Sequence, residues 1–466
     1  MSTAPTALIM AAGRGTRMRS SVPKVLHEVC GRPMVAWPIL AARAAGAGRV
    51  CVIVSPESDN SSALPEGTET VVQPESDGTG GALRAAREVI SSSETVLVLS
   101  GDSPLLGAEA IAGLIDAHRE GGADATVMTT ELDDPGTFGR VVRGSSGEVE
   151  RIVETKVPGD ATSAELAIKE VNAGTYAFAA GPLAAALERL SADNAQGEYY
   201  LPDVVPLIRE AGGSVAAHLV GDPAVNLGVN DRVELARVTV EARRRILRAH
   251  MLAGVTVEDP DSTWIDADVE LAPDVTLAPG CALRGRTSVG SGSVIGPMTT
   301  LTDSRIGERV TVLHSFLVSC AVADGATIGP FSYLRPDAEL GPGSKAGAFV
   351  EIKNSRIGEG AKVPHLAYVG DSEIGERTNL GAGTITANYD GFRKHRTKVG
   401  RGVRTGVDTS LVAPVEVGDG AYTGAGSVIT EDVPAGALGI SRAEQQNVPG
   451  YAERKAKANE EGKASS

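Results

Sequence analysis

The chain is poor in aromatic residues and in cysteine. Its 466 residues include 6 Phe, 8 Tyr, 2 Trp and 4 Cys, and the cysteines Cys30, Cys51, Cys281 and Cys320 form no CxxC pair. The sequence therefore indicates neither a zinc site nor a disulfide framework. The first residues lack a basic segment followed by a long apolar run, so we expect no signal peptide and no membrane span. Together these absences favour a reducing, cytoplasmic location.

Charge and glycine content narrow the class of protein further. The chain carries 44 Lys and Arg against 59 Asp and Glu, a formal net charge of −15. This balance argues against nucleic-acid binding and means that an anionic ligand must meet local basic sites. Glycine is abundant, with 56 residues or about 12% of the chain, where roughly 7% is usual. Hydrophobic residues make up 42%, which excludes disorder, and no strict Gly-X-Y period appears, which excludes collagen.

Up to about residue 235, short apolar runs alternate with alanine-rich stretches of helical pattern. Residues 7–10 and 95–100 are near-continuous apolar runs, whereas 33–45 has helical spacing. This alternation is typical of βαβ units, whose parallel strands are covered on both faces. We therefore expect a doubly wound, Rossmann-like α/β domain over 1–235, followed by a linker helix over 236–262.

Beyond this linker the apolar period becomes six. Such a repeat is the signature of a parallel β-helix, in which each face of a prism uses one hexapeptide and a coil takes about 18 residues. Between about 268 and 434 we expect roughly nine coils, with a length of about 40 Å at the usual strand spacing. The main runs are Leu271, Leu277, Leu283, Val289, Ile295, Leu301; Val322, Ile328, Leu334, Leu340, Ala346, Ile352; and Val399, Thr405, Leu411, Val417, Thr423, Ile429.

A β-helix would account for the unusual composition. Corners with positive φ would use glycine, and a narrow interior would leave no room for large rings. The repeat breaks at 388–398, where the polar and mostly basic string NYDGFRKHRTK cannot lie inside a coil. We expect an extruded loop there, which is a favoured place for function, although a decorative surface loop is the alternative. The β-helix is predicted over 263–440, and a loosely ordered polar tail over 441–466.

The turn after the first predicted strand has the chemistry of an anion site. Gly13 and Gly15 allow close approach of a ligand to the backbone, and Arg17 and Lys24 supply positive charge, so polyphosphate is the natural partner. The pattern is neither GxxxxGK[ST] nor GxGxxG, which disfavours a kinase-type P-loop and a dinucleotide fold. Asp102 ends another predicted strand, where one carboxylate suits a Mg²⁺ that also holds phosphate oxygens; a turn or N-cap role is the alternative.

Several motifs follow one another in a characteristic order over nearly the whole chain. They are AAGRGTRM with PK, Gly78-Thr79, SGD, GTFGR, IVE, VNAG and GVNDR, followed by the predicted β-helix. In this order they closely resemble the bifunctional N-acetylglucosamine-1-phosphate uridylyltransferase/glucosamine-1-phosphate N-acetyltransferase family. The resemblance implies acetyl-CoA-dependent acetylation of glucosamine 1-phosphate, then Mg²⁺-dependent uridylyl transfer from UTP to N-acetylglucosamine 1-phosphate. It also implies a left-handed β-helix that associates as a homotrimer.

The resemblance assigns roles to residues of the first domain. Arg17 and Lys24 would bind the phosphates of UTP, and Asp102 and Asn230 would hold Mg²⁺. The implied reaction is in-line attack by a sugar 1-phosphate oxygen on the α-phosphorus of UTP, which needs positioning and charge neutralisation more than a protein nucleophile. The remaining predicted contacts are Ala11, Ala12, Gly13 and Gly101 at the nucleotide, Gln73, Gly78 and Thr79 at the uracil, and Gly139, Glu154 and Asn172 at the amino sugar.

In the β-helix the resemblance points to His365 as the catalytic base. Acetyl transfer requires the sugar ammonium to lose a proton, and histidine, with an ordinary pKa of about 6.5, suits that task; a plain corner residue is the alternative. Asn388 and neighbouring backbone N–H groups would stabilise the oxyanion of the tetrahedral intermediate. The other predicted contacts are Arg335 and Lys353 for the sugar phosphate, Tyr368, Asn379 and Lys394 for the sugar, and Ala382, Asn388, Tyr389, Val407, Ala425 and Arg442 for acetyl-CoA.

Three positions depart from the family pattern. The family commonly reads GTGHA where residues 78–82 read GTGGA, so that Gly81 replaces a histidine, and Asp77 replaces an apolar residue. The common GSDT is GVDT here, with Val407 for a serine that lies near the acetyl-CoA sulfur in the family. These changes would affect nucleotide affinity and stabilisation of the thiolate leaving group, respectively.

Two other functions stay open on the sequence alone. The chain could be a uridylyltransferase only, with the β-helix as a trimerisation or regulatory module. It could also be a sugar-nucleotide sensor with inactive sites. The string from Arg335 through His365 to Lys394 argues against a purely structural prism, and the presence of Lys24 and Asp102 argues against a sensor.

Overall fold

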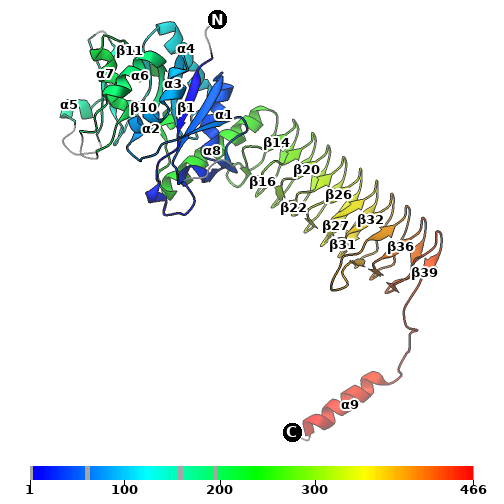
Figure 1. Cartoon of the computed structure of the whole chain (residues 1–466). Coiled ribbons are helices and arrows are strands. Elements are labelled where there is room, and N and C mark those ends of the chain that lie inside the picture. Colours follow the sequence, from blue (N-terminus) through cyan, green and yellow to red (C-terminus); the bar gives the residue numbers. More distant parts are fainter. Residues whose placement is uncertain (1–3, 58–62, 146, 156–160, 194–196, 465–466) are drawn as a thin grey trace. The chain divides into compact units, whose positions relative to one another are not determined.

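The chain divides into two compact units (Figure 1). The first is Met1–Ala249 with Ile265–Asp268, and the second is His250–Trp264 with Val269–Ser466. The first is an α/β domain and the second consists mainly of short parallel strands, so both predicted fold classes are confirmed. The structure is a computed structural model that describes residues 4–57, 63–145, 147–155, 161–193 and 197–464.

A mainly parallel sheet forms the centre of the first unit. Its strands are ordered β11-β7-β10-β6-β1-β4-β5, and β1 pairs in parallel with β4 on one side and β6 on the other. Strand β10 is antiparallel to β6 and β7, and the β8–β9 hairpin branches from it. Because crossovers leave in both directions around β1, the carboxyl ends of β1 and β6 form the switch point where ligands bind in such sheets. The strands are β1 (Thr6–Met10), β4 (Arg49–Val54), β5 (Glu69–Val72), β6 (Thr95–Ser100), β7 (Ala125–Glu131), β8 (Arg140–Arg143), β9 (Val149–Val153), β10 (Glu170–Ala179) and β11 (Val215–Leu219), with the small pair β2 (Glu28–Val29) and β3 (Arg32–Pro33) apart from the sheet.

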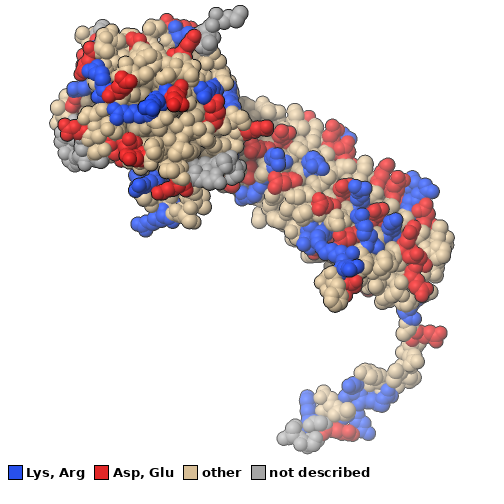
Figure 2. Space-filling model, viewed as in Figure 1, with Lys and Arg blue, Asp and Glu red and all other residues tan. Residues whose placement is uncertain are grey.

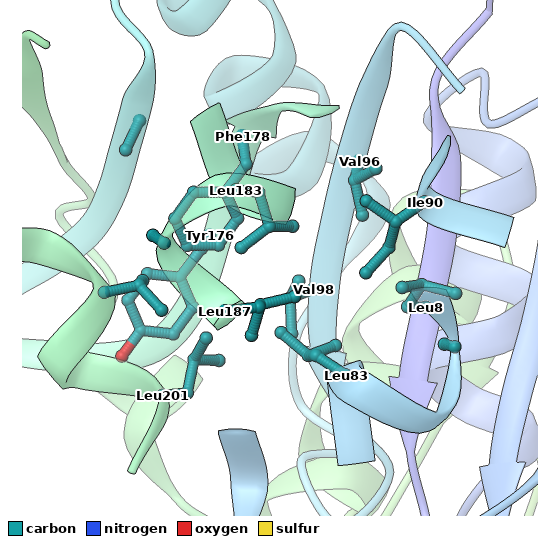
Figure 3. Close-up of a cluster of buried hydrophobic side chains, with 14 of the residues drawn as sticks. Leu8, Leu83, Ile90, Val96, Val98, Tyr176, Phe178, Leu183, Leu187 and Leu201 are labelled. Atoms are coloured by element: carbon teal, nitrogen blue, oxygen red, sulfur yellow. The ribbon is translucent and has the colours of Figure 1, made fainter. Parts of the chain in front are cut away.

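Two hydrophobic clusters lie on the two faces of this sheet. Leu8 belongs to one cluster and its neighbour Ile9 to the other, because successive side chains of a strand point to opposite faces. Figure 3 shows the first cluster, where Leu83 and Leu187 from the helices approach Val98 of the sheet. The helices of the unit are α1 (Ala36–Ala44), α2 (Thr79–Ala85), α3 (Arg87–Ser91), α4 (Ala108–Gly121), α5 (Ser163–Leu166), α6 (Ala180–Arg189) and α7 (Val204–Glu210).

Helix α8 (Arg232–Leu252) coincides with much of the predicted linker, and its residues up to Ala249 belong to the first unit. It buries Val238, Ala242 and Leu247 and leaves most of its other side chains at least partly exposed. Among the described residues, no helix has the length and apolar character needed to span a membrane.

The second unit is a β-helix, as the six-residue repeat predicts (Figure 1). Leu283 pairs with Leu301 and Leu301 with Leu317, so a coil takes 18 residues in one case and 16 in the other. The predicted inward positions are buried, except that Leu271 in the first coil is partly exposed. One sheet contains β12 (Thr256–Val257), β15 (Thr276–Leu277), β18 (Val294–Ile295), β21 (Thr311–Val312), β24 (Thr327–Ile328), β27 (Lys345–Ala348) and β30 (Lys362–His365).

The two other long sheets complete the prism. The second contains β13 (Trp264–Ile265), β16 (Ala282–Arg284), β19 (Thr300–Thr302), β22 (Phe316–Val318), β25 (Tyr333–Leu334), β28 (Glu351–Lys353), β31 (Tyr368–Gly370), β33 (Ile385–Ala387), β35 (Ser410–Val412) and β38 (Val428–Ile429). The third contains β14 (Glu270–Leu271), β17 (Ser288–Val289), β20 (Arg305–Ile306), β23 (Ala321–Val322), β26 (Ala338–Leu340), β29 (Ser355–Ile357), β32 (Ser372–Ile374), β34 (Thr397–Val399) and β36 (Val415–Val417). The last pair is β37 (Tyr422–Thr423) with β39 (Leu438–Gly439).

Glycine serves the β-helix in a way that the sequence only partly predicts. Gly280 takes a left-handed corner, as expected, but Phe331 and Phe349 hold such corners too, with φ of 59° and 58°. Other glycines allow coils to stack closely. A Cβ at Gly341 would lie 2.9 Å from the backbone nitrogen of Glu359 in the next coil, which no side chain tolerates. This stacking column consists of Gly290, Gly307, Gly341, Gly358, Gly375, Gly400 and Gly418.

Aromatic rings lie outside the prism, as the prediction of a narrow interior requires. Phe331 and Phe349 are more than half exposed, and their rings stack with centroids 5.3 Å apart. Backbone hydrogen bonds join successive coils at this corner, such as the bond from the Phe331 N–H to the His314 oxygen. These bonds align the two phenylalanines with the corner residues of neighbouring coils. We call Met298, His314, Phe331, Phe349 and Leu366 the apolar corner column.

The predicted loop is extruded from the β-helix. Ile374 pairs with Val399, a step of 25 residues, because the chain leaves the coil between them. Phe392 at the loop is 92% exposed. The Asp390 carboxylate accepts hydrogen bonds from the backbone N–H groups of the loop, above all that of Arg393, and from the His395 ring, which lower the pKa of Asp390 to about 2. The loop is thus a defined turn. After the β-helix, the polar tail contains the exposed helix α9 (Tyr451–Ala464).

Candidate active sites

A cleft opens at the carboxyl ends of β1 and β6 in the first unit. It comprises two adjoining cavities of about 470 and 810 Å³, which share Arg17, Thr79 and Asn230 in their lining. Every predicted nucleotide-sugar contact lines one or both cavities except Gly101, which lies beside them and donates its backbone N–H to the Met10 oxygen at 2.9 Å. The fold therefore brings together residues from 11 to 230 at one switch point.

The glycine-rich turn is shaped around Lys24. Gly15 is left-handed, with φ of 59°, and a Cβ there would lie 2.6 Å from the Cβ of Lys24. Glycine at this position therefore allows the lysine to lie against the turn. Arg17 lies in a single 3₁₀ turn, Thr16–Met18, and Lys24 begins a second one after Pro23. The two cations thus enter the smaller cavity from rigid, short elements.

Lys24, Asp102 and Asn230 converge at the bottom of this cavity. The Lys24 ammonium donates to Asp102 Oδ2 and lies 3.4 Å from Asn230 Oδ1. Asp102 Oδ1 accepts from the Ser100 hydroxyl at 2.6 Å, so both carboxylate oxygens are engaged, and the Asp102 backbone oxygen accepts from the Val229 N–H at 3.0 Å. A carboxylate and an amide oxygen that face one cation are the hard ligands that Mg²⁺ prefers.

This donor set fits a cation that takes few protein ligands. Among the described residues, no group of three or more His, Cys, Asp or Glu could hold a metal ion. Mg²⁺ usually binds through one or two carboxylates or carbonyls and completes its shell with water and phosphate oxygens. The residues present therefore suit a magnesium–nucleotide complex rather than a permanent metal centre.

The larger cavity contains the residues predicted for the amino sugar. Asn172 donates its backbone N–H to the Gly139 oxygen at 2.9 Å and its side-chain N–H to the Tyr176 hydroxyl at 2.6 Å. Burial raises the pKa of Tyr176, so this hydroxyl stays neutral and orients the amide. Glu154 lines the same cavity. Polar groups on β10 and beside the β8–β9 hairpin thus surround a space suited to a sugar.

The end of the cleft that contains the residues predicted for uracil lies between residues 198–201 and the start of α2. The Gly80 N–H donates to the Tyr199 oxygen at 2.7 Å, and the Thr79 hydroxyl accepts from the Leu201 N–H at 3.0 Å. The sequence analysis did not predict residues 198–201 as part of the site, although Glu198 lines both cavities. It missed Ser100 as well, although the SGD string offered that signal.

Cations gather on the β-helix around the extruded loop. Figure 2 shows Lys and Arg side chains clustered near β27 and β31. The pKa of Lys353 is lowered, first by its contact with Lys394 and further by the charge of Arg335. Arg335 also pairs with Glu351 at 2.8 Å. Neighbouring cations that destabilise one another are stabilised by a dianion, so this cluster suits a sugar phosphate.

His365 shortly precedes β31, which pairs with the strand of Lys353, and Asn388 directly follows β33, which pairs with β31. His365 ends β30 and is exposed, whereas Asn388 is buried. The Asn388 amide nitrogen donates to Asp371 Oδ2 and lies 3.5 Å from the Tyr368 hydroxyl. Because these bonds occupy the side-chain N–H groups, donors to an oxyanion would come from backbone N–H groups, and the Asn388 amide oxygen is the side-chain atom left to face a ligand.

Three of the residues predicted for acetyl-CoA, Ala382, Val407 and Ala425, lie in successive coils along one edge of the prism. Successive coils stack there through backbone hydrogen bonds, and the Arg442 guanidinium donates to the Ala425 oxygen at 3.0 Å. Val407 is half exposed on this edge. The bonds run from Gly383 N–H to the His365 oxygen, from Asp408 N–H to the Ala382 oxygen and from Gly426 N–H to the Val407 oxygen.

Comparison with known proteins decides the family. Residues 7–201 match the family of MobA-like NTP transferase domains. The bifunctional protein GlmU of Kineococcus radiotolerans is 50% identical over 450 residues, which cover 95% of this chain and 91% of that protein. The chain belongs to the GlmU family. The bifunctional protein GlmU of Mycolicibacterium gilvum is 48% identical over 458 residues, which cover 96% of this chain and 91% of that protein. The protein of the same name from Mycobacterium tuberculosis is 47% identical over 458 residues, which cover 96% of this chain and 92% of that protein.

Membership in the GlmU family confirms the resemblance drawn from the motifs. The chain is accordingly a bifunctional enzyme with uridylyltransferase and N-acetyltransferase activities. A uridylyltransferase with a merely structural β-helix is not favoured, because the similarity extends over both units.

Proposed function

We propose that the first unit transfers the uridylyl group of UTP to N-acetylglucosamine 1-phosphate in the cleft at β1 and β6. The observation that carries this assignment is the convergence of Lys24, Asp102 and Asn230 beside the glycine-rich turn. Arg17 and Lys24 neutralise the triphosphate, and the backbone around Gly13 follows its oxygens. The uracil lies against Gln73 and Thr79, in the smaller cavity.

The sugar phosphate approaches from the larger cavity. Asn172, held by the Tyr176 hydroxyl, and Glu154 orient the sugar so that a phosphate oxygen faces the α-phosphorus. A P–O bond forms there while the bond to pyrophosphate breaks, and Lys24 compensates the charge that develops on the leaving group. Asp102 and Asn230 would hold Mg²⁺, which supplies additional charge neutralisation at the phosphates when bound.

The β-helix acetylates glucosamine 1-phosphate. Arg335, Lys353 and Lys394 hold the phosphate and the sugar, and their mutual repulsion in the free protein is relieved by the dianion. His365 removes a proton from the sugar ammonium, and the free amine attacks the thioester carbon of acetyl-CoA. The nitrogen gives up its second proton as the tetrahedral intermediate breaks its C–S bond, and the expelled coenzyme A thiolate takes up a proton. Acetyl-CoA lies along the edge that contains Val407 and Ala425, where the extruded loop provides Tyr389.

The assembly is a homotrimer formed through the β-helix. The apolar corner column supports this proposal, because four of its five side chains are large, apolar and more than half exposed, and such a row on a rigid scaffold is typical of an interface. We place the domain boundaries at residue 235 before the linker helix, at residue 262 before the β-helix and at residue 440 before the polar tail. We also propose a cytoplasmic location. The location is supported by Cys51, Cys281 and Cys320, which are buried thiols whose pKa burial raises to about 11.

Product analysis tests the order of the two reactions. The protein is incubated with glucosamine 1-phosphate, acetyl-CoA, UTP and Mg²⁺, and each product is followed by mass spectrometry. We expect coenzyme A and N-acetylglucosamine 1-phosphate first, then pyrophosphate and UDP-N-acetylglucosamine. Omission of acetyl-CoA should block the nucleotide product, whereas added N-acetylglucosamine 1-phosphate should restore it. Rapid formation of UDP-glucosamine without acetyl-CoA would contradict the proposed order.

Substitution of Val407 tests its proposed position at the thioester. Val407→Ser introduces a hydroxyl that can donate to the departing thiolate, so we expect the rate of coenzyme A release to rise about two- to tenfold. Val407→Ala is the matched control, because it removes the same bulk without adding a donor. The rates are measured at saturating acetyl-CoA. An unchanged rate in the serine variant would show that residue 407 does not contact the sulfur.

A further inference from the structure

The Gln73 side chain has a fixed orientation in the nucleotide cleft. Its amide nitrogen donates to Asp77 Oδ1 at 2.8 Å and to the Gly78 backbone oxygen at 3.1 Å. A carboxylate and a carbonyl are acceptors only, so they bind the NH₂ end of the amide and exclude the flipped arrangement. Gln73 is buried and lines the smaller cavity, and within the described residues no hydrogen bond is donated to its Oε1.

Gly81 makes this arrangement sterically feasible. It is buried in α2, and a Cβ at this position would overlap the carboxylate of Asp77. The clash is with the end of a side chain, so any larger residue would displace that carboxylate rather than the backbone. Gln73, Asp77 and Gly81 all line a third cavity of about 620 Å³. The two departures from the family pattern are therefore one feature, a carboxylate and the space that accommodates it.

We propose that Asp77, accommodated by Gly81, is a positioning residue that selects the base of the nucleotide through Gln73. With its NH₂ group held by Asp77, the amide offers only its oxygen to a ligand. Uracil presents an N3–H donor, which matches that oxygen, whereas cytosine has an unprotonated acceptor at N3. A freely rotating glutamine could serve either base, so the fixed amide adds discrimination against cytosine. This inference rests on the proposed placement of uracil at Gln73.

A double-substitution cycle with two nucleotides tests the inference. The kcat/KM of uridylyl and cytidylyl transfer is measured with UTP and CTP for Asp77→Ala, Gly81→Ala and the double variant. We expect Asp77→Ala to lower the UTP-to-CTP ratio about tenfold, mainly through KM. Gly81→Ala should lower it similarly, because the new methyl displaces the carboxylate. The double variant should be no worse than either single one, since both remove the same hydrogen bond.

Two further variants sharpen the result. Asp77→Asn retains an acceptor oxygen, so it should keep the ratio within about threefold of the parent protein. Glu75→Ala removes a negative charge from an exposed residue of the same loop and should leave the ratio unchanged. An unaltered ratio in Asp77→Ala, or independent and additive losses in the two alanine variants, would overturn the inference.

Gln73→Ala separates this inference from the proposed function. If Gln73→Ala leaves the KM for UTP unchanged, the uracil does not lie at Gln73 and the placement itself is wrong. If Gln73→Ala raises that KM while Asp77→Ala has no effect on the ratio, the placement stands and only the role of Asp77 is refuted. The circular dichroism spectrum and the thermal unfolding of each variant report whether the first unit is folded, and acetyl transfer, measured on the same preparations, should not change because its residues lie in the other unit.

Discussion

Replacing His365 with alanine is expected to reduce acetyl transfer by about 10²- to 10⁴-fold, the usual contribution of a general base. Without a base the sugar nitrogen stays protonated and has no lone pair for attack on the thioester. Uridylyl transfer should remain nearly unchanged, because its residues lie in the other compact unit. The two activities are followed in one preparation, as coenzyme A release and as pyrophosphate release from UTP.

His365→Asn is the control variant, because it keeps a polar side chain of similar size where His365→Ala removes most of the side chain. It retains polarity but cannot accept a proton, so it should be as inactive in acetyl transfer as the alanine variant. Raised pH should partly restore both variants, because more of the sugar amine is then free without a base. A simultaneous loss of acetyl and uridylyl transfer would contradict two independent sites, and full acetyl transfer in either variant would remove the catalytic role.

Asp102→Ala should have the opposite effect, a loss of uridylyl transfer of at least about 10²-fold with acetyl transfer intact. The substitution removes the carboxylate that faces the Lys24 ammonium and that would hold Mg²⁺. The rate of pyrophosphate release is measured across a magnesium titration. We expect the variant to need far more Mg²⁺ than the parent, because Asn230 alone would face the cation.

The matched control for this prediction is Asp102→Asn, which keeps the shape and one oxygen but removes the charge. It should bind Mg²⁺ more weakly than the parent and more tightly than the alanine variant. Chelation of the metal should abolish uridylyl transfer in the parent and leave acetyl transfer unaffected. If Asp102→Ala transfers the uridylyl group as fast as the parent protein at limiting Mg²⁺, Asp102 does not bind the metal.

Local pattern predicts the β-helix well, because each coil repeats the same short-range requirement. An inward position such as Leu301 recurs at a nearly constant interval, and its burial follows from that interval alone. The extruded loop is visible for the same reason, since Asn388 to Lys398 interrupts the period. The corners are less predictable. Phe331 and Phe349 hold left-handed conformations where glycine was expected, because stacking on the next coil favours residues that the period does not specify.

The cleft at β1 and β6 is built from residues that lie far apart in the sequence. The glycine-rich turn indicates an anion site and the SGD string a carboxylate. Lys24 and Asn230, however, are 206 residues apart in the sequence, and only the fold brings the Lys24 Nζ and Asn230 Oδ1 atoms to 3.4 Å from each other. The contribution of residues 198–201 was missed, because their role depends on hydrogen bonds to α2 rather than on any local pattern.

By itself, the sequence determined the fold class of both units, the family and the types of residue that carry the chemistry, because periodicity and motif order are properties of the chain. Tertiary structure alone decided which groups share a hydrogen bond. In the sequence, Asp77 and Gly81 are two separate departures from the family pattern. In the structure, the Asp77 carboxylate accepts a hydrogen bond from Gln73 and occupies the space that Gly81 leaves open. Orientation of an amide depends on the acceptors that surround it in three dimensions, and no linear pattern records them.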